Sequence, residues 1–307
     1  MNRVGKIRIG IAGTGRVAQA LGRLLHQRGH LITAIAGRDL RRTSEAAAFI
    51  GMNVRSVSLP DLPRAASHVI VAVPDDALPL VARTLAGSEA PIRVALHTCG
   101  SRGPEALAGL AERGASYGAL RSYGASLGTL HPLQTISTRE QGAADLPGSY
   151  FGITASGEAL EWALEICGAL DGHPLVIAPE RRPLYHAAAV MASNYIVAMI
   201  DAAAMLMERA GVAADQALPA LAPLIEASVR NSLNSGPVQA LTGPIERGDE
   251  QTIASHVRAL GDAPESVRNL YRSAGLHAAN IARRKSPGAD RSKIESLLTE
   301  ESPEDEG

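Results

Sequence analysis

The 307-residue sequence has little of what marks a secreted, metal-bound or nucleic-acid-binding protein. It has two cysteines, Cys99 and Cys167, too few for a disulfide framework and without partners at metal-ligand spacing. Its 30 basic and 31 acidic residues nearly cancel, so no basic field would attract nucleic acid or an anionic membrane. The first residues contain no apolar stretch of signal-peptide type. We therefore expect a cytoplasmic protein, without a metal centre, that acts on a small molecule.

The first half of the chain alternates short β-type runs with helix-type segments, which is typical of βαβ units around a parallel sheet. Helices are expected at residues 104–113 and 158–170, and residues 124–130 form a strand or loop that leads to His131. We expect an α/β domain with a doubly wound Rossmann sheet over residues 1–178. Its expected strands are residues 7–12, 31–36, 68–73, 93–97, 150–154 and 174–177.

From Arg181 onward the β-type runs stop, and alanine-rich segments of helical length take over. We expect an all-helical substrate and dimerisation domain over residues 179–285. Residues 286–307 lack apolar periodicity and are expected to be a disordered, solvated tail. The expected helices are residues 183–210, 215–234, 249–261 and 263–284.

The first of these helices is apolar on nearly every side between Ala187 and Met207. Its length would allow a membrane span. Ser193, Asn194 and Asp201 interrupt the apolar run, which favours a helix buried on all faces by its own domain and by a second subunit. We therefore expect no membrane partner, and a homodimer formed through the helical domain.

A glycine-rich loop joins the first expected strand to the first expected helix. Gly13 permits a tight turn, Gly15 lets the backbone approach a pyrophosphate, and the small Ala18 lets the helix pack on the strand. The N-terminus of the helix adds unpaired N–H groups and the positive end of its dipole. The pattern predicts a dinucleotide site whose loop residues are Gly13, Thr14, Gly15, Arg16 and Val17.

The end of the second expected strand bears on the choice between NAD and NADP. An acidic residue there would bind the ribose hydroxyls of NAD, whereas arginine suits the 2′-phosphate of NADP. Arg38 stands where the acid is expected, with Arg41 and Arg42 close behind. These features favour NADP, although Asp39 keeps NAD open and the arginines would also suit a solvated helix start.

Two further strand ends are expected at the same edge of the sheet. The apolar run ending in Val73, Pro74 and Asp75 places these residues beside the cofactor, although a plain strand cap would look the same. Thr98 and Ser101 follow the next strand and reach the same rim.

Taken together, these segments resemble a superfamily of two-domain dehydrogenases that includes 6-phosphogluconate dehydrogenase, pyrroline-5-carboxylate reductase, prephenate dehydrogenase and ketopantoate reductase. The sequence is more similar to bacterial Rossmann-like proteins whose second half is the domain of unknown function 2520. This resemblance implies an N-terminal Rossmann domain, a helical domain that often dimerises, and a cleft between them. The matching segments are residues 13–18, 72–75, 130–135, 185–190 with 193–195, and 241–249.

The resemblance also implies catalytic groups, and here the sequence departs from the pattern. The hydroxyacid and ketopantoate branches would place a lysine on the interdomain helix, four residues before an asparagine. Asn194 matches the asparagine, as a residue that orients substrate, but Val190 occupies the lysine position. His186 lies one turn before Val190, about 80° around the helix from Asn194 and about 12 Å along it. His186 and Asn194 would line one elongated cleft without gripping one atom.

Two histidines are therefore candidates for the proton donor, because imidazole titrates near neutrality. His131 begins a His-Pro turn that resembles the one in prephenate dehydrogenases, where the histidine works next to the reacting carbon. His186 is the second candidate. Each has an equal structural alternative: a turn histidine for His131, and a packing or capping histidine for His186.

The segment around Arg247 is expected to be a turn followed by a helix that Asp249 or Thr252 caps. Arg247 would bind a substrate carboxylate through two hydrogen bonds, or would pair with Glu246 or with solvent.

Three functions fit these features. The first is an NADPH-dependent reductase of a small carbonyl acid, with a ketopantoate-like 2-oxo acid as the best single candidate. The second is reduction of an imine, as in pyrroline-5-carboxylate reductase, which needs no catalytic lysine. The third is an NADP-binding sensor without catalysis.

Overall fold

The computed structural model describes residues 7–111 and 124–299. The chain divides into two compact units, Met1–Ser193 and Asn194–Gly307. The first unit extends past residue 178, where the sequence analysis placed the boundary. The reason is that helix α8 (Arg182–Met191) buries the side chain of its first residue among the strands of the first unit.

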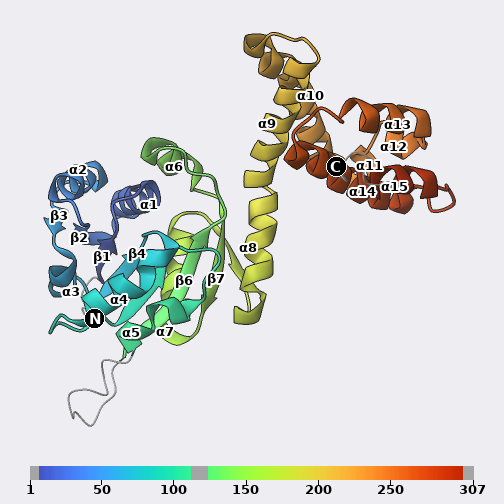
Figure 1. The fold of residues 1–307 in the computed structure, drawn as a ribbon. Helices are drawn as coiled ribbons and strands as arrows, with labels where there is room; N and C mark the ends of the chain where they lie inside the picture. Colours follow the sequence, from blue (N-terminus) through green and yellow to red (C-terminus); the bar gives the residue numbers. More distant parts are fainter. Residues whose placement is uncertain (1–6, 112–123, 300–307) are drawn as a thin grey trace, which may run out of the picture. The chain divides into compact units, whose positions relative to one another are not determined.

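In the described part of the first unit, eight strands form one sheet in the order β3-β2-β1-β4-β5-β6-β7-β8 (Figure 1). All neighbouring strands run parallel except β6 and β7. This order, with its crossover beside β1, confirms the predicted doubly wound Rossmann sheet. The short β3 and the reversal at β7 were not predicted. The strands are β1 (Arg8–Ala12), β2 (Leu31–Ala36), β3 (Arg55–Val57), β4 (His68–Val71), β5 (Val94–His97), β6 (Ser126–Pro132), β7 (Tyr150–Ala155) and β8 (His173–Val176).

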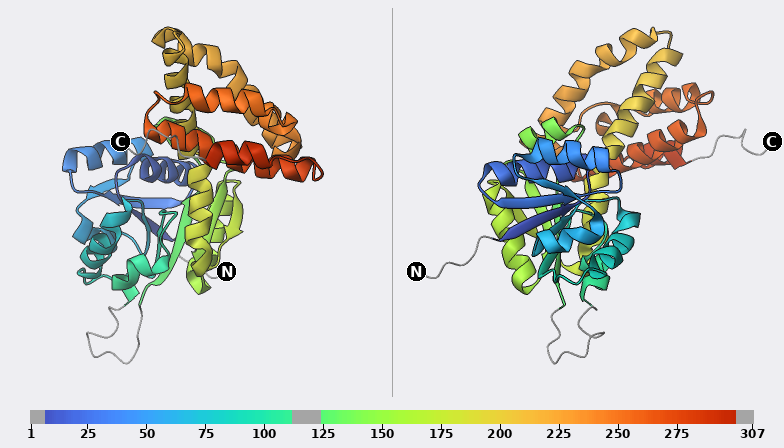
Figure 2. Two further views of the ribbon diagram at one scale, coloured as in Figure 1. Left: turned by 45° about the vertical axis from the view of Figure 1, so that its right-hand side comes forward. Right: turned by 90° about the vertical axis from the view of Figure 1, so that its left-hand side faces the viewer.

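Helices cover both faces of this sheet (Figure 2). One core contains buried residues of α1 (Arg16–Gln27), α2 (Leu40–Ile50) and α7 (Gly157–Ala169). The other contains residues of α3 (Leu62–Ala65), α4 (Leu78–Ala86) and α5 (Ala108–Ala111). The predicted helix 104–113 is a 3-10 turn, η3 (Pro104–Leu107), followed by α5, and its last two residues lie outside the described part. The remaining short elements are η1 (Leu59–Asp61), η2 (Asp75–Ala77), α6 (Arg139–Asp145) and η5 (Pro179–Arg181).

In the second unit the described residues form helices joined by turns, with no strand among them, as predicted. Asp249 accepts hydrogen bonds from the backbone N–H and the hydroxyl of Thr252, so the predicted capping residue is confirmed. The helices are α9 (Asn194–Arg209), α10 (Ala214–Ser235), α11 (Pro237–Ala240), α12 (Pro244–Arg247), α13 (Glu250–Ala259), α14 (Glu265–Lys285) and α15 (Ser292–Thr299).

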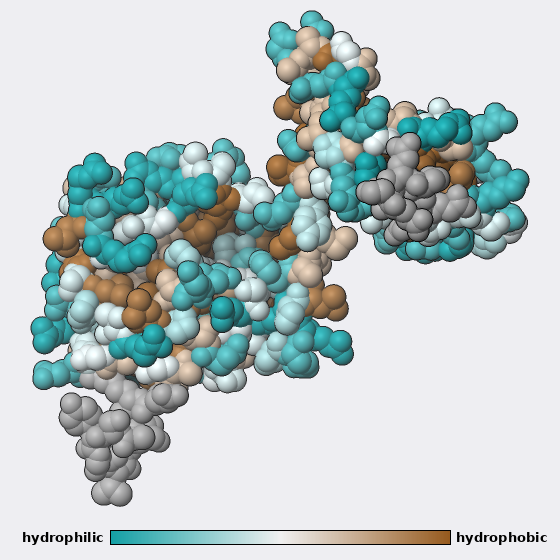
Figure 3. All heavy atoms as spheres, viewed as in Figure 1, coloured by the Kyte–Doolittle hydropathy of each residue, from teal (hydrophilic) through white to brown (hydrophobic). Residues whose placement is uncertain are grey.

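The expected helix 183–210 is divided between the two units. Regular α-helix stops at Met191 and resumes at Asn194, and between them the Ser193 hydroxyl donates to the Ala189 carbonyl. No residue of α9 is buried, and apolar side chains appear along it in Figure 3. Burial by its own domain was therefore a wrong prediction for α9. By length and composition the stretch Pro179–Arg209 would suffice to cross a membrane, a test that core helices of soluble proteins also pass.

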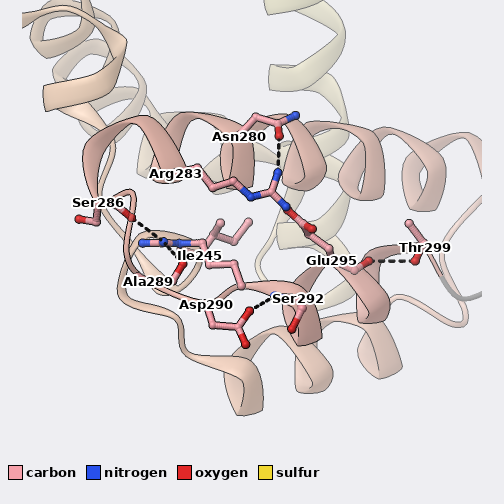
Figure 4. A network of polar contacts seen from close by, with 10 residues as sticks. Ile245, Asn280, Arg283, Ser286, Ala289, Asp290, Ser292, Glu295 and Thr299 are labelled. Carbon is pink, nitrogen blue, oxygen red and sulfur yellow. Dashed lines mark hydrogen bonds and ion pairs between the residues drawn. The ribbon is translucent and has the colours of Figure 1, made fainter.

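The predicted disordered tail is wrong for residues 292–299. Helix α15 buries Ile294 and Leu298 against α13 and α14. Arg283 of α14 pairs with Glu295, close to Ile245, Ser286 and Ala289 (Figure 4). The buried Arg291 donates to the backbone carbonyls of Ile245, Glu246, Ser286 and Ala289. Two apolar residues, one helical turn apart, are enough to dock α15, although they are not part of a longer apolar periodicity. Residues 300–307 lie outside the described part.

Candidate functional site

The loop after β1 has the backbone geometry that its glycines predict. Gly13 has a φ of +117°, and a Cβ atom there would lie 2.1 Å from the Ala72 carbonyl oxygen. The Gly13 N–H donates to the Ala36 carbonyl, and the Ala72 N–H donates to the Ala12 carbonyl. Gly13 therefore lies at the carboxyl end of β1, between the end of β2 on one side and the end of β4 on the other. The chain connections of β2 and β4 leave the sheet in opposite directions at this point. Such a switch point is where open α/β sheets bind their ligands.

Gly15 differs from Gly13, because a Cβ atom added at Gly15 would have no protein atom within 4 Å. The protein itself therefore does not require a glycine at this position. Gly15 is the exposed N-cap residue of α1, makes no side-chain cap hydrogen bond, and has no acidic residue in the turn that follows. The first N–H groups of α1 are thus open to a ligand with the charge of a phosphate. Arg16 is tied to the Ser137 carbonyl at 2.8 Å, while Thr14 and Val17 are half-buried beside the loop.

The charged residues that follow β2 differ in their contacts, and these contacts indicate different roles. Asp39 is the N-cap of α2 and accepts from the Arg42 N–H at 2.9 Å. That hydrogen bond keeps the pKa of Asp39 below its usual value. Its role as the cap of α2 explains Asp39, so no contact with a ribose is needed to account for it. Arg41 pairs with Glu45. Arg38 is exposed and, among the described residues, makes no hydrogen bond or ion pair, so its guanidinium remains available to an anion.

The ends of β4 and β5 meet at the same rim. Val73 is half-buried against Gly13, and Thr98 donates its N–H to the Val71 carbonyl. Asp75 follows Pro74, the residue before η2, and accepts from the Ser101 hydroxyl at 2.9 Å. Burial alone would raise the pKa of Asp75. Hydrogen bonds from Cys99 and Ser101, together with the charge of His186, outweigh burial and lower the pKa, so Asp75 is ionised.

His97, at the end of β5, is fully buried and serves structure. Its Nδ1 accepts from the Cys99 N–H at 3.2 Å, so its Nε2 is the nitrogen that donates to the Gly103 carbonyl at 2.8 Å. Burial lowers the pKa of His97 to about 4. The imidazole is therefore neutral and has no nitrogen left for a ligand.

His131 lies on β6 near the carboxyl end, at the edge of the sheet that carries the phosphate loop. Its Nδ1 lies 2.8 Å from the Tyr185 hydroxyl of α8, and the two rings meet edge to face. Burial, reinforced by the charges of His186 and Arg182, lowers the pKa of His131 to about 4. Near neutral pH this imidazole is uncharged.

The second predicted histidine, His186, lies beside the first. Its ring centroid is 5.8 Å from that of His131. A Cβ atom on Gly100 would lie 2.4 Å from the Nδ1 of His186 and 2.8 Å from the Nε2 of His131. The absence of a side chain at Gly100 therefore allows both rings to approach the same point. The Nδ1 of His186 is buried and has no hydrogen-bond partner within the described residues.

Arg182, one turn before the second histidine, holds this cluster together, and sequence reasoning missed it. The guanidinium is almost completely buried. It donates to the hydroxyls of Thr129 and Thr154 and to the carbonyls of Cys99 and Gly100, at 2.8 to 3.1 Å. One side chain thereby joins the loop after β5, the middle of β6 and the end of β7 to the start of α8. An Arg-Arg-Pro sequence at a helix start carries no signal of such burial.

Two predicted residues do not belong to this unit. Asn194 begins α9 of the second unit. Arg247 ends the short α12, is exposed, and is not paired with Glu246, which contacts Lys285 instead. Within residues 7–111 and 124–299, no three histidine, cysteine or acidic residues gather as metal ligands do.

Comparison with protein families supports the two-domain organisation. Residues 2–121 match the model of a Rossmann-like domain, and residues 149–278 match the domain of unknown function 2520. The predicted resemblance is thereby confirmed. No curated protein matches the sequence.

Solved structures share this fold along nearly the whole chain. A Bacteroides fragilis protein provisionally assigned as an NADP oxidoreductase is 24% identical, with a TM-score of 0.68 over 90% of this chain and 98% of its own. An Aspergillus terreus reductive aminase, solved with NADPH and ethyl levulinate, is 18% identical, with a TM-score of 0.62 over 96% and 99%. A Plasmodium falciparum pyrroline carboxylate reductase, solved with NADP, is 13% identical, with a TM-score of 0.52 over 95% and 98%. At these identities the likeness establishes the fold.

Proposed function

We propose that this chain, which joins a Rossmann-like domain to a domain of unknown function 2520, is an NADP-dependent oxidoreductase that reduces a polarised double bond of a small molecule. One observation carries the proposal: two neighbouring histidines, His131 and His186, lie at the same sheet edge as an open phosphate loop and as Arg38, which is unpaired among the described residues. The names of the similar solved structures, which include NADPH-bound and NADP-bound reductases, support it.

The residues present fit the cofactor. Gly13 and Gly15 open the loop, the uncapped N-terminus of α1 receives the pyrophosphate, and Arg38 receives the 2′-phosphate. Bound NADPH would supply the hydride. The protein then has to orient the substrate, polarise its carbonyl or imine bond, and deliver one proton. His131 and His186 are the groups placed for the last two tasks.

For the substrate we propose a small carbonyl acid of the ketopantoate type. An imine is the second candidate, favoured by two observations. Val190 replaces the lysine that the ketopantoate branch would use. In addition, the ionised Asp75 interacts with His186, and a carboxylate there would stabilise the positive charge of a protonated imine.

The test is NADPH consumption by the full chain with a panel of 2-oxo acids and a panel of cyclic and acyclic imines. Turnover of one panel identifies the substrate class. Substituting His131→Ala should then lower kcat/KM by at least about 100-fold, the usual contribution of a positioned proton-transfer group. NADPH binding without any turnover would favour the sensor hypothesis and contradict this proposal.

We also propose that a second copy of the chain covers α9. The helix leaves Tyr195 and Val197 more than half exposed and Met199 44% exposed. Apolar side chains exposed to this degree on more than one side of a helix favour association with another chain. Sedimentation should show a dimer, and Val197→Asp should shift it to monomer while leaving Trp162 fluorescence in the other unit unchanged. A monomeric parent protein would rule out the dimer.

A further inference from the structure

A cavity of about 280 Å³ lies at the amino edge of the sheet, where β1, β2 and β3 begin. The phosphate loop lies at the opposite edge, after the end of β1. Arg8 lines the cavity, and the strand from Arg8 to Gly13 spans about 16 Å. The cavity is therefore separate from the loop that the cofactor would occupy.

Four of the ten described residues that line this cavity are basic, and none of the ten is acidic. The guanidinium groups of Arg8 and Arg55 are charged at any pH at which the chain is folded. Neither makes a hydrogen bond or an ion pair within the part of the chain that the structure describes. His26 and His30 add an N–H donor each, because imidazole donates at least one hydrogen bond in either tautomer. The lining is thus complementary to an anion.

Arg8 and Arg55 lie on either side of β2. Arg8, on β1, pairs with Leu31 at the start of β2, and Arg55, on β3, pairs with Ala34. Residues 31–33 of β2 line the cavity between them. Neighbouring strands lie about 4.8 Å apart, so β1 and β3 are about 10 Å apart. One small ligand over β2 is therefore within reach of both guanidinium groups.

A β-bulge in β2 places both arginines on the same face of the sheet. The pairing of β2 with β1 shifts by one residue at Thr33. Ile32 and Ala34 consequently pack in different cores, although residues two apart on a regular strand share a face. Without the bulge, Arg8 and Arg55 would lie on opposite faces. The bulge therefore brings two arginines from separate strands to one cavity.

The turn between α2 and β3 forms a further wall of the cavity. A Cβ atom on Gly51 would lie 2.4 Å from the ring of His26, so the absence of a side chain at Gly51 lets this ring lie against the turn. Asn53 has a φ of +70°, a conformation that asparagine adopts more readily than most residues. Its side-chain amide carries two further donors. The turn thereby adds uncharged donors to the two arginines.

The size and composition of the cavity restrict its ligand. Its volume of about 280 Å³ is just below the ~300 Å³ at which typical ligand pockets begin, so it suits a small molecule. Paired guanidinium groups favour phosphate, which accepts two parallel hydrogen bonds from each. Leu31 and Met52, which are 41% and 84% exposed, offer apolar surface for a carbon skeleton.

We propose that this cavity is a second ligand site, which binds a small molecule carrying a phosphate group. Arg8 and Arg55 bind the phosphate oxygens, and His26, His30 and Asn53 donate further hydrogen bonds. The apolar side chains beside them contact the carbon part of the ligand. The site requires neither the cofactor nor turnover, so it does not depend on the reductase function.

The direct test is a titration of the full chain, without cofactor, with inorganic phosphate at neutral pH. The ring ¹H–¹⁵N signals of His26 and His30, assigned by their loss in His26→Asn and His30→Asn, report binding in the cavity. We expect both to shift and to saturate, while sodium chloride at equal ionic strength gives no saturable shift. His277, exposed on α14 of the second unit, should not respond. A response that is absent, or equal with chloride, overturns the proposal.

Charge-removing variants locate the phosphate. Arg55→Gln and Arg8→Gln should each raise the Kd of inorganic phosphate at least about 10-fold, because each removes a charged donor. Arg64→Gln is the matched control, since it removes a nearby exposed arginine of α3 that already pairs with Asp61, and it should change this Kd less than about 2-fold. Equal losses in all three variants would indicate general attraction of anions and contradict the site. Unchanged Trp162 fluorescence verifies that each variant is folded.

NADPH binding distinguishes this site from the cofactor loop. Arg55→Gln should leave the Kd of NADPH within about 2-fold of the parent value, because the two sites are far apart. A parallel loss of NADPH binding in Arg55→Gln would make the cavity part of the cofactor site and overturn the proposal. A chain that binds phosphate here but binds no dinucleotide would contradict the reductase function and leave this second site intact.

Discussion

The carboxyl edge of the sheet has two halves that are built in opposite ways. Around Gly15 and Arg38 the surface is open, and the groups that face it make few contacts with the protein. Around Arg182 and His131 the groups are crowded, buried and joined by hydrogen bonds across three strands and a helix. An open half binds a ligand that brings its own charge, whereas a crowded half fixes a few atoms in one orientation. Substitutions should therefore weaken binding in the first half and stability or catalysis in the second.

The largest effect is expected at Arg182. Arg182→Met removes four hydrogen bonds, and the backbone carbonyls of Cys99 and Gly100 lose their Arg182 donor. The free energy of unfolding should fall by about 3–5 kcal/mol. Urea unfolding followed by Trp162 fluorescence measures it, because this residue is the chain's only tryptophan and lies in the same unit. Arg181→Met, at the exposed neighbouring position, should change stability by less than about 0.5 kcal/mol. An equal loss of stability for Arg182→Met and Arg181→Met would contradict the claim that the buried hydrogen bonds of Arg182 stabilise this half of the edge.

The second effect is a dependence of stability on pH. The pKa values of His97 and His131 are lowered to about 4 in the folded chain, against about 6.5 when unfolded. Between pH 4 and 6.5 the unfolded chain binds more protons, so the free energy of unfolding falls as the pH falls. The slope should approach about 1.4 kcal/mol per pH unit for each histidine. Unfolding at pH 7.0 and 5.0 should show a smaller loss for His131→Asn than for the parent chain, and an equal loss would refute the buried neutral state of His131.

The two loop glycines should separate folding from binding. Gly13→Ala places a methyl group against the Ala72 carbonyl at a positive φ and should cost about 1–3 kcal/mol of stability. Gly15→Ala meets no protein atom, so stability should change by less than about 0.5 kcal/mol while the Kd of NADPH rises about 10-fold or more. Unchanged NADPH binding by Gly15→Ala would show that the loop does not hold the pyrophosphate.

The smallest predicted effect concerns cofactor choice. Arg38→Ala should raise the Kd of NADPH about 10-fold, or about 1.4 kcal/mol, and leave that of NADH within about 2-fold. Arg41→Ala, at a residue already paired with Glu45, is the matched control and should change neither much. Titration of tryptophan fluorescence or calorimetry distinguishes these outcomes. Equal losses for both cofactors would assign Arg38 to general attraction of anions.

The two halves of the edge also differ in how far the sequence predicts them. The phosphate loop is local: strand, glycines and helix follow one another within 20 residues, so their pattern revealed the fold and the position of Arg38. The histidine half depends on contacts between residues far apart in the chain. Arg182 makes hydrogen bonds to residues that are 28 to 83 positions away in the sequence, and His131 contacts Tyr185, which is 54 positions away. His131 and His186 were recognised as single residues, but not as neighbours over Gly100.

The other differences between the predicted and the observed structure have the same origin, which is contact between parts of the chain that are distant in the sequence. A strand as short as β3 has no periodicity of its own and exists because β2 pairs with it. Helix α15 was read as a tail because two apolar residues become a docking face only when α13 and α14 surround them. Conversely, the apolar pattern of α9 predicted burial, but a single chain does not provide it.

The central claim is that this chain uses NADP at the loop around Gly15, and direct titration of the intact protein with NADPH and NADH tests it. We predict saturable binding of NADPH with a Kd at least about 10-fold below that of NADH, the difference that one well-placed arginine contributes to a phosphate. Tighter binding of NADH would contradict the assignment of Arg38, and no binding of either dinucleotide would contradict the proposed function as a whole.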